Sequence, residues 1–564
     1  MTDPAGARRP HPWEAHYPEG VRWDVAPTDE TIPDAFAAAV ERYADRVALS
    51  YRGPDLTYAE LGRRAWQAAN ALIAEGFGRG DTLALYLPNT LWHPFFYYGA
   101  LAAGGRVAHL SALDPLRVLT HKATDSGSRI LVTLNLPDLV KMALRLLDDG
   151  AVEKVILCDE AAFGPFPIPL APKPDRADVV DAGAFLSGAP ATRPACGSSP
   201  DDVALLQYTG GTTGLPKGAM LTHRNLVGAV RSYNAWTAAD PALAEEGATL
   251  CVLPLFHIYA LAVVLMRTTE TGGRIVLRMR FDPDQAFDDI ERHKITYFPA
   301  VPTIWIAMAA HPGMETRDIS SLSNAGSGGA PLPVEVGRRF EMKAGLPLLG
   351  GWGMTETCGA GTSVPEGAQS ARPGTIGVPL PGMTMRIVDH GEPTRELAPG
   401  EVGEIAIRGI PVTPGYWNRQ DATAQSHVDG WFLTGDMGRM DADGFFYLVD
   451  RKSDLIISGG FNVYPQMIEQ AVYEHPDVAE CSVIGVPDPY RGESAKAFVT
   501  LKAGAAPFSL ESLQAFLEDR LGRHEIPRAL EFRDALPRTP VGKLSRKELR
   551  DEEAAKRAAE AAAE

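Results

Sequence analysis

A loop rich in glycine and threonine lies near the middle of the chain, directly after a short apolar run. It reads Thr209-Gly-Gly-Thr-Thr-Gly-Leu-Pro-Lys-Gly218. Glycine lets backbone N–H groups approach phosphate oxygens closely, threonine hydroxyls add donors, and Lys217 supplies a positive charge. The spacing is not that of a Walker A loop, because two residues separate Gly214 from Lys217. The residues alone leave a phosphate-binding loop and a flexible surface loop as alternatives; the candidate phosphate ligands are Thr209, Gly210, Gly211, Thr212, Thr213 and Gly214.

Later segments of the chain carry groups that suit the rest of a nucleotide. Gly351-Trp-Gly-Met-Thr-Glu356 combines an aromatic ring, a hydroxyl and a carboxylate, and a carboxylate suits a hard cation that bridges phosphates. Asp436 ends the segment Gly430-Trp-Phe-Leu-Thr-Gly-Asp436, and the pair Asp450-Arg451 follows it. Each group alone has a plainer explanation, such as a core aromatic ring, an acid at a helix N-terminus, a turn aspartate or a surface ion pair.

The residues from Tyr208 to Asn225, YTGGTTGLPKGAMLTHRN, resemble the signature of the adenylate-forming enzymes. This superfamily includes acyl-CoA synthetases, peptide-synthetase adenylation domains and beetle luciferases. The downstream segments resemble the other motifs of the superfamily in the same order, from about residue 35 to 550, and are most similar to bacterial fatty-acyl-CoA ligases. The resemblance implies that ATP activates a carboxylic acid as an acyl-adenylate, and that the acyl group then passes to a thiol, with coenzyme A as the first choice.

The resemblance also implies roles for the nucleotide-site residues. Trp352 would stack on adenine where the family usually has tyrosine, so the tyrosine hydroxyl is lost. Thr355 would contact the α-phosphate, and Glu356 would help to hold Mg²⁺. Asp436 would accept hydrogen bonds from the ribose hydroxyls, and Arg451 would also reach the nucleotide. The remaining residues predicted beside the nucleotide are Gly329, Ala330, Pro331, Gly351 and Gly353.

Three further roles belong to the C-terminal part of the chain. Lys543, in Pro540-Val-Gly-Lys-Leu-Ser-Arg546, resembles the lysine that enters the site for adenylation, and a solvated lysine is the alternative. Ser453 occupies the hinge position, where the family usually has Asp or Lys. The resemblance implies that the small domain rotates there, so that Lys543 leaves and the face that binds coenzyme A enters; the predicted coenzyme A residues are Ser458, Gly459 and Gly460. The context of Lys543 also resembles sites that bacterial acetyltransferases modify, and acetylation would remove the charge and block adenylation.

The acyl group is expected to lie between two apolar and aromatic segments, residues 255–266 and 298–308. His257 resembles a histidine at the wall of the acyl pocket, where we expect it to position substrate and not to transfer protons. The predicted pocket residues are Phe256, His257, Val301, Gly326 and Gly328. These walls favour medium- or long-chain fatty acids. Aryl acids and dicarboxylates stay open, and Arg267 or Arg278 would serve a distal carboxylate.

The composition narrows the choice of partners and compartment. The chain has 54 Lys and Arg against 71 Asp and Glu, and this net charge of −17 disfavours nucleic acid as the main partner. Five scattered cysteines without zinc-ligand spacing indicate a reducing cytoplasm. The N-terminus has no secretory signal, and no apolar run is long enough to span a membrane, which leaves peripheral membrane contact open. The choice between a monomer and a homodimer stays open.

The elements that must position these residues alternate between short apolar runs and helical patterns. Strands are predicted over 81–87, 155–158 and 203–208, and a helix over 93–103, whereas residues 159–202 read as an irregular connection. We therefore expect an α/β fold with mostly parallel sheets over residues 1–450, the adenylation domain. A small α+β domain over 451–564 follows, with strands at 479–484 and 495–501 and helices from Pro465 and over 509–521. The last residues, RDEEAAKRAAEAAAE, have high helix propensity but no apolar face, so we expect a solvated tail.

Two rivals to an acid–CoA ligase remain open. One is a ligase that loads the acyl group onto the phosphopantetheine of a carrier protein, and the other is a nucleotide or acyl binder without catalysis. The combined presence of five polar groups argues against the binder; these are Lys217, Glu356, Asp436, Arg451 and Lys543.

Overall fold

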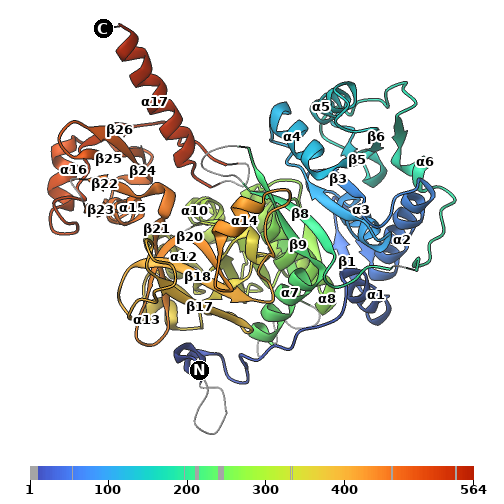
Figure 1. The fold of residues 1–564 in the computed structure, drawn as a ribbon, viewed down its shortest axis with the longest axis horizontal. Coiled ribbons are helices and arrows are strands. Elements are labelled where there is room, and N and C mark those ends of the chain that lie inside the picture. The colour runs from blue at the N-terminus through green and yellow to red at the C-terminus, as the bar shows by residue number, and fades with distance from the viewer. Residues whose placement is uncertain are drawn as a thin grey trace.

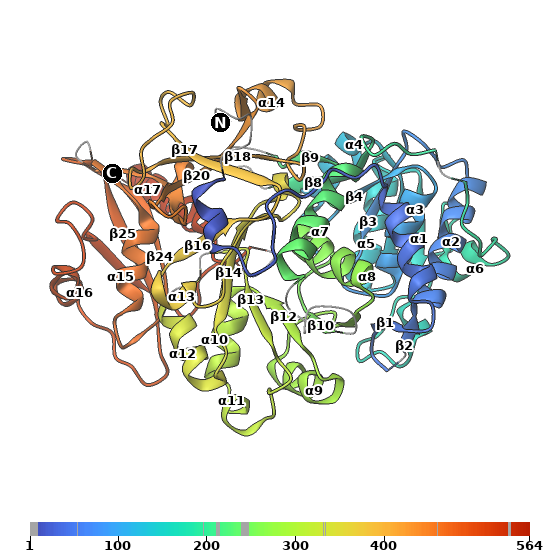
Figure 2. The ribbon, with the colours of Figure 1, turned by 90° about the horizontal axis from the view of Figure 1, so that it is seen from below.

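The computed structural model describes residues 10–53, 55–195, 197–209, 215–238, 247–330, 332, 334–458, 461–539 and 543–563. Within these residues the strands form three sheets, two in the larger N-terminal part and one in a small C-terminal unit. Figure 1 shows the C-terminal unit, in orange and red, beside the larger part, with the last helix pointing away from both. Figure 2 shows the first sheet (blue) and the C-terminal unit at opposite ends of the molecule, with β12 to β18 between them.

The first sheet has seven strands among the described residues and is parallel except at its β8–β9 edge. Its strands, in spatial order, are β7 (Val179–Asp181), β6 (Lys154–Cys158), β5 (Ser128–Leu134), β3 (Thr82–Tyr86), β4 (Arg106–His109), β8 (Val203–Thr209) and β9 (Lys217–Thr222). Every residue of β3 is buried, as expected for a parallel strand covered on both faces. The helices around this sheet are α2 (Tyr58–Ala74), α3 (Trp92–Ala102), α4 (Leu116–Ser126), α5 (Pro137–Asp148) and α6 (Ala182–Leu186).

The second sheet has fourteen strands within the described part of the chain and is mixed. Its parallel part contains β1 (Val47–Ser50), β10 (Ala248–Cys251), β11 (Arg274–Leu277), β12 (Tyr297–Ala300), β13 (Asn324–Ser327) and β14 (Leu348–Gly353). The strands that pair antiparallel are β2 (Asp55–Thr57), β15 (Gly361–Ser363), β16 (Thr375–Pro379), β17 (Met383–Val388), β18 (Gly403–Gly409), β19 (His427–Val428), β20 (Trp431–Met440) and β21 (Phe446–Arg451). Apart from the edge pairs β8–β9 and β1–β2, the expectation of mostly parallel sheets therefore holds as far as β14. Beyond it, connections such as that between β20 and β21 are too short for the crossover that a parallel pair needs.

Helices and turns complete the larger part of the molecule. The helices not yet named are α1 (Ile32–Arg42), α7 (His223–Thr237), α8 (Arg267–Thr271), α9 (Pro283–His293), α10 (Pro302–Ala310), α11 (Gly313–Thr316), α12 (Val334–Ala344), α13 (Ala368–Ala371) and α14 (Gln420–Ser426). A π-helix, Tyr259–Met266, runs directly into α8. Short 3₁₀ turns occur at Pro12–His16, Glu160–Phe163, Thr355–Thr357 and Lys452–Asp454.

The C-terminal unit is α+β and has hydrophobic clusters of its own. Its strands are β22 (Ile456–Ser458), β23 (Phe461–Val463), β24 (Val478–Asp488), β25 (Gly492–Leu501) and β26 (Ala529–Phe532), and its helices are α15 (Pro465–Tyr473), α16 (Leu510–Leu517) and α17 (Arg546–Ala563). The central hairpin β24–β25 is antiparallel. The tail is helical, as its propensity predicts, and fully buried Leu549 anchors the start of α17.

The connection over residues 159–202 is more ordered than expected. It contains β7, which pairs in parallel with β6, and the short helix α6. A three-residue strand is too short to show the period-2 alternation by which strands are recognised in a sequence. Among the described residues, no helix is both long and apolar enough to cross a membrane.

Candidate active site

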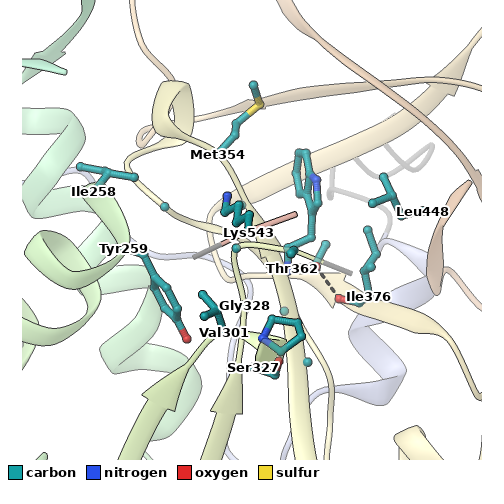
Figure 3. Close-up of a pocket in the computed structure, with 18 of the residues that line it drawn as sticks. Ile258, Tyr259, Val301, Ser327, Gly328, Met354, Thr362, Ile376, Leu448 and Lys543 are labelled. Atoms are coloured by element: carbon teal, nitrogen blue, oxygen red, sulfur yellow. Dashed lines mark hydrogen bonds between the residues drawn. The ribbon is translucent and has the colours of Figure 1, made fainter. Parts of the chain in front are cut away.

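A cavity of about 1720 Å³ lies where the second sheet meets the C-terminal unit. Its walls include the ends of β13 and β14, residues of β20 and β21, and the loop before α17. Ligands of open α/β sheets commonly bind at the carboxyl ends of parallel strands, and β13 and β14 present such ends here. Figure 3 shows Lys543 near Gly328 and Val301, with Tyr259 beside them.

The glycine- and threonine-rich loop is closed at its base. Thr209 and Lys217 are directly opposite each other in the antiparallel pair β8–β9, and both line the cavity. The residues between them that were predicted to bind phosphate, Gly210 to Gly214, lie outside the described residues. The strand pairing thus places both ends of the loop at the cavity and directs Lys217 toward it.

Lys217 and Glu356 flank the ring of Tyr416, a residue that the sequence analysis missed. The Lys217 Nζ atom lies 5.5 Å from the centroid of the Tyr416 ring, and the Tyr416 hydroxyl donates to Glu356 Oε1 at 2.8 Å. Tyr416 is 60 positions from Glu356 along the chain, so no local spacing pointed to it. Thr355, whose predicted role is at the α-phosphate, also lines the cavity and precedes Glu356 in the same 3₁₀ turn.

The Glu356 carboxylate is the candidate metal ligand. Burial raises its pKa, and the hydrogen bond from Tyr416 opposes that shift. The described residues contain no cluster of three or more His, Cys, Asp or Glu side chains that could hold a metal ion. Magnesium is commonly bound by one or two carboxylates together with substrate phosphates. One buried carboxylate in the cavity that Thr209 and Lys217, at the base of the predicted phosphate loop, also line therefore fits a Mg²⁺ ion that arrives with ATP, where the ion would neutralise phosphate charge.

Trp352 and Arg451 both contact the carboxylate of Asp436. The Trp352 indole N–H donates to Asp436 Oδ2 at 2.8 Å, and Arg451 Nε lies 3.0 Å from Asp436 Oδ1. Asp436 and Arg451 meet because they are opposite each other in the β20–β21 register. Tryptophan lacks the tyrosine hydroxyl that is usual in the family, but its indole N–H donates to the predicted ribose ligand. Gly351, Gly353 and Ala330 line the same cavity, whereas Pro331 lies outside the described residues.

Lys543 reaches into the cavity from a short loop of the C-terminal unit. The loop is closed by the backbone N–H of Thr539, which donates to the Lys543 carbonyl at 2.7 Å. A Cβ atom at Gly329 would lie only 3.1 Å from Lys543 Cε, so the glycine, at φ +79°, leaves room for the lysine side chain. Burial, with a smaller contribution from the positive charge of Arg451, lowers the Lys543 pKa to about 8.

Of the predicted hinge and coenzyme A residues, the structure describes Ser453, at the edge of the cavity, and Ser458, apart from it. Ser453 is exposed in the 3₁₀ turn Lys452–Asp454 and lines the rim. Ser458 is buried in β22, where it pairs with Gly492, and it does not line the cavity. Gly459 and Gly460 lie outside the described residues. The structure thus brings Lys543, and not Ser458, to the nucleotide-site residues.

The residues predicted for the acyl pocket lie together on the cavity wall; they are Phe256, His257, Val301, Gly326 and Gly328. Burial, with a smaller contribution from the Lys543 charge, lowers the His257 pKa to about 3. A neutral imidazole cannot donate a proton as an acid at pH 7, which agrees with a positioning role. Gly328 gives space to Tyr259, because a Cβ there would lie 3.1 Å from the Tyr259 ring. Tyr259 belongs to the segment 255–266 that was expected to line the acyl group, but it was not among the predicted pocket residues.

Comparison with known proteins places this site in a family. The model of AMP-binding enzymes matches residues 36–417, more than half of the chain, and the model of their C-terminal domain matches residues 467–543. The chain belongs to the AMP-binding, adenylate-forming enzyme family. All the described nucleotide-site residues up to Tyr416 lie within the first match, and Lys543 ends the second.

The relatives of this AMP-binding enzyme include three enzymes named for different acids. A long-chain-fatty-acid–CoA ligase of Bacillus subtilis is 38% identical over 556 residues, which cover 96% of this chain and 98% of that protein. A feruloyl-CoA synthase of an Amycolatopsis species is 37% identical over 512 residues, or 89% and 95% of the two chains. The solved o-succinylbenzoate-CoA synthetase (MenE) of B. subtilis, in complex with ATP and a magnesium ion, is 28% identical, with a TM-score of 0.78 and coverage of 93% and 100%.

Proposed function

We propose that this chain, an acid–CoA ligase of the AMP-binding family, activates medium- or long-chain fatty acids with ATP and transfers them to coenzyme A. The observation that carries the proposal is the position of Lys543, whose side chain lies against Gly329 in the cavity that also contains Trp352 and Asp436. A buried ammonium group at this position would stabilise a reaction in which two anionic groups, a carboxylate and the phosphates of ATP, must approach each other.

In the first half-reaction, a carboxylate oxygen attacks the α-phosphorus of ATP and pyrophosphate leaves. The product is an acyl-adenylate, a mixed anhydride whose leaving group is AMP instead of oxide. Because the attack brings anions together, positive groups that are already in place lower the barrier. Lys543 would face the carboxylate and Lys217 the phosphates, while Asp436 and Trp352 would hold the ribose and adenine. Mg²⁺ near Glu356 would supply further positive charge when bound.

In the second half-reaction, the thiol of coenzyme A attacks the acyl carbon and AMP leaves. Ser458 lies outside the cavity while Lys543 is in it, and both belong to the same C-terminal unit. We therefore propose that residues 451–564 rotate against residues 1–450 about Ser453 between the two steps. The exposed turn Lys452–Asp454 suits a hinge, since a few backbone torsions there can change without disturbing a core.

The fatty acid assignment is supported by the cavity wall. Val263, Val301 and Tyr259 line its acyl side, and a closely similar relative is named as a long-chain-fatty-acid–CoA ligase. Each buried CH₂ group contributes about 0.8 kcal/mol, or nearly fourfold in affinity, so turnover should show an optimum along a chain-length series. The feruloyl-CoA synthase keeps aryl acids as the second candidate.

The test is pyrophosphate release with ATP and Mg²⁺ across a panel of fatty, aryl and dicarboxylic acids, with and without coenzyme A. The proposal predicts sustained turnover on fatty acids that requires coenzyme A. Pyrophosphate release at the same rate with and without coenzyme A would indicate a carrier protein as the acyl acceptor. If no acid of the panel causes pyrophosphate release, the enzyme does not act on these acids, and a protein that only binds nucleotide or acyl groups is favoured.

A further inference from the structure

A chain of hydrogen bonds between buried side chains ends at the acyl wall of the cavity. His93 Nε2, on α3, lies 3.1 Å from His109 Nε2, and His109 Nδ1 lies 3.0 Å from Gln207 Oε1. Gln207 Nε2 donates to the Phe256 carbonyl at 2.9 Å. All three polar side chains are buried, and His109, Gln207 and Phe256 line the cavity. The chain therefore joins a buried helix to a residue predicted to contact the acyl group.

The direction of each hydrogen bond follows from the last acceptor. A carbonyl oxygen can only accept, so the Gln207 amide presents its NH₂ group to Phe256 and its oxygen to His109, whose Nδ1 must donate. Burial lowers the pKa of His109 to about 4 and holds that of His93 well below its usual range, so both rings are neutral at pH 7. His109 Nε2 is then an acceptor, and His93 Nε2 donates to it. His93 Nδ1, which has no hydrogen-bond partner among the described residues, is left as a lone pair and not as an unpaired N–H.

The end of this chain fixes the peptide between Phe256 and His257. Its carbonyl accepts from Gln207, and its N–H donates to the Pro254 carbonyl at 2.9 Å. Because a peptide unit is planar, bonds at its two ends set its orientation, and with it the directions in which the Phe256 and His257 side chains leave the backbone. The His257 ring is held too, since its Nδ1 accepts from the Tyr259 N–H at 3.3 Å.

Gln207 connects two parts of the site that belong to different sheets. It lies in β8, two residues before Thr209 at the base of the glycine- and threonine-rich loop, whereas Phe256 follows β10 of the second sheet. The backbone of Gln207 is opposite Ala219 in the β8–β9 pair, so strand pairing fixes where its side chain begins. The amide thus transmits the position of a rigid strand to the acyl wall.

We propose that Gln207, oriented by His109 and His93, is a positioning residue for the acid, because it sets the directions of Phe256 and His257 at the acyl wall. The proposal rests on the proposed ligase function and deepens it, since it concerns how the acid is bound. Buried polar networks can also serve only to make a fold rigid. A chain with that role alone would affect stability and both substrates, and not the acid in particular.

The test measures KM for the acid, KM for ATP and kcat of coenzyme A-dependent pyrophosphate release. The acid is the saturated fatty acid, from hexanoate to hexadecanoate, on which the wild type is most active. Gln207→Met keeps the length of the side chain and removes both of its hydrogen bonds. KM for the acid should rise by roughly tenfold, while KM for ATP stays within about twofold and kcat changes less than KM for the acid.

The matched control is Gln514→Met in the C-terminal unit. The Gln514 amide also donates to a backbone carbonyl, that of Pro527 at 2.8 Å, but it does not line the cavity. Its loss should leave KM for the acid unchanged. A rise in KM for ATP as large as that for the acid in Gln207→Met would overturn the positioning role.

Two substitutions at His109 separate hydrogen bonding from packing. His109→Asn keeps an N–H near the position of Nδ1, so KM for the acid should stay near the wild-type value. His109→Leu offers no donor to Gln207 and should raise KM for the acid severalfold. Equal KM values for the acid in the two variants would contradict the proposal. These two variants decide the question if Gln207→Met does not fold.

The ¹⁵N resonances of the histidine rings test the chain without relying on turnover. In the wild type, His109 should be the Nδ1–H tautomer and His93 the Nε2–H tautomer, with the His109 signals assigned by their loss in His109→Asn. The opposite tautomer at His109 would overturn the chain even in an active ligase. Failure of the proposed function is distinct, because the wild type would then release no pyrophosphate with any acid of the panel, and the positioning role would fall with it.

Discussion

At the scale of single residues, Lys543 carries a charge whose loss should be visible in the pH dependence of adenylation. Its pKa is lowered to about 8, mainly by burial, so the ammonium form exists below that pH and is lost as the pH rises through it. Because the charged form is the one that stabilises the transition state, kcat/KM for acyl-adenylate formation should fall above pH 8. The pH profile of pyrophosphate release at limiting ATP measures this.

Lys543→Arg is the informative variant, because arginine stays protonated throughout this range. Its residual activity should show no descending limb near pH 8. A descending limb at the same pH in the arginine variant would assign the titration to another group.

Acetylation of Lys543 stays a prediction, and mass spectrometry after treatment with an acetyltransferase and acetyl-CoA tests it.

The hydrogen bond from Trp352 to Asp436 gives a second residue-scale prediction. Trp352→Phe keeps an aromatic face for adenine but removes the N–H that lies 2.8 Å from Asp436 Oδ2. A hydrogen bond to a charged group contributes roughly 1.5–3 kcal/mol, so KM for ATP should rise by roughly tenfold or more. Steady-state kinetics at saturating acid and coenzyme A measure this.

The matched control is Trp431→Phe, which changes a tryptophan of β20 that does not line the cavity. Its KM for ATP should stay near that of the wild type. An unchanged KM in Trp352→Phe would mean that the indole N–H does not position Asp436, the predicted ribose ligand.

The candidate site residues that line the cavity were predictable where they lie in contiguous motifs. Lys217, Glu356, Asp436, Arg451 and Lys543 could be named because each lies within a recognisable run of residues. Tyr416 and the amide of Gln207 could not, because their relation to the site arises only when distant strands and loops meet. The direction of the Trp352 N–H was hidden for the same reason, since Asp436 is 84 positions away.

At the scale of elements, the contact between β21 and the start of α17 holds Lys543 in place. Arg546 Nη1 lies 2.6 Å from Asp450 Oδ1, and Asp450 Oδ2 accepts from the backbone N–H of Gln466 at 2.7 Å. Arg546 also pairs with Glu469 and Asp454 within the C-terminal unit. A rotation about Ser453 would break the contacts to Asp450 and keep the other two.

Asp450→Asn should therefore slow adenylation more than thioester formation. The substitution removes the charge that faces Arg546, and the expected loss in adenylation is roughly tenfold or more. Single-turnover assays measure the two half-reactions separately, with the acyl-adenylate supplied for the second. Glu474→Gln is the control, because it breaks an exposed pair with Arg520 in the same unit without touching β21. Equal losses in both half-reactions would argue against a specific role for the Arg546–Asp450 contact in the arrangement that carries out adenylation.

The elements themselves were predictable to different degrees. The strands β3, β6 and β8 and the helix α3 begin and end within one residue of expectation, because buried runs bounded by glycine or polar residues are distinctive. Helix α16 ends at Leu517, earlier than the predicted 521. The π-helix Tyr259–Met266 was not foreseen, since nearly every one of its residues is apolar and buried and a uniform run has no periodicity to read.

At the scale of the whole molecule, the site exists only because two parts of the chain meet. The larger part contributes Lys217, Glu356 and Asp436, and the C-terminal unit contributes Lys543. The order of motifs in the sequence predicted this partnership, but not which face of the small unit would be turned inward. The structure shows the arrangement with Lys543 at the nucleotide site, which is the one expected for the first half-reaction.

The most direct test of this account is a comparison of the two half-reactions in Lys543→Ala. Single-turnover kinetics would follow acyl-adenylate formation from ATP and acid, and then thioester formation from supplied acyl-adenylate and coenzyme A. Adenylation should slow by roughly 10²–10³-fold, typical of the removal of one transition-state stabiliser, while thioester formation should stay close to the wild-type rate. An equal loss in both steps would contradict the assignment of Lys543 to adenylation and the rotation built on it.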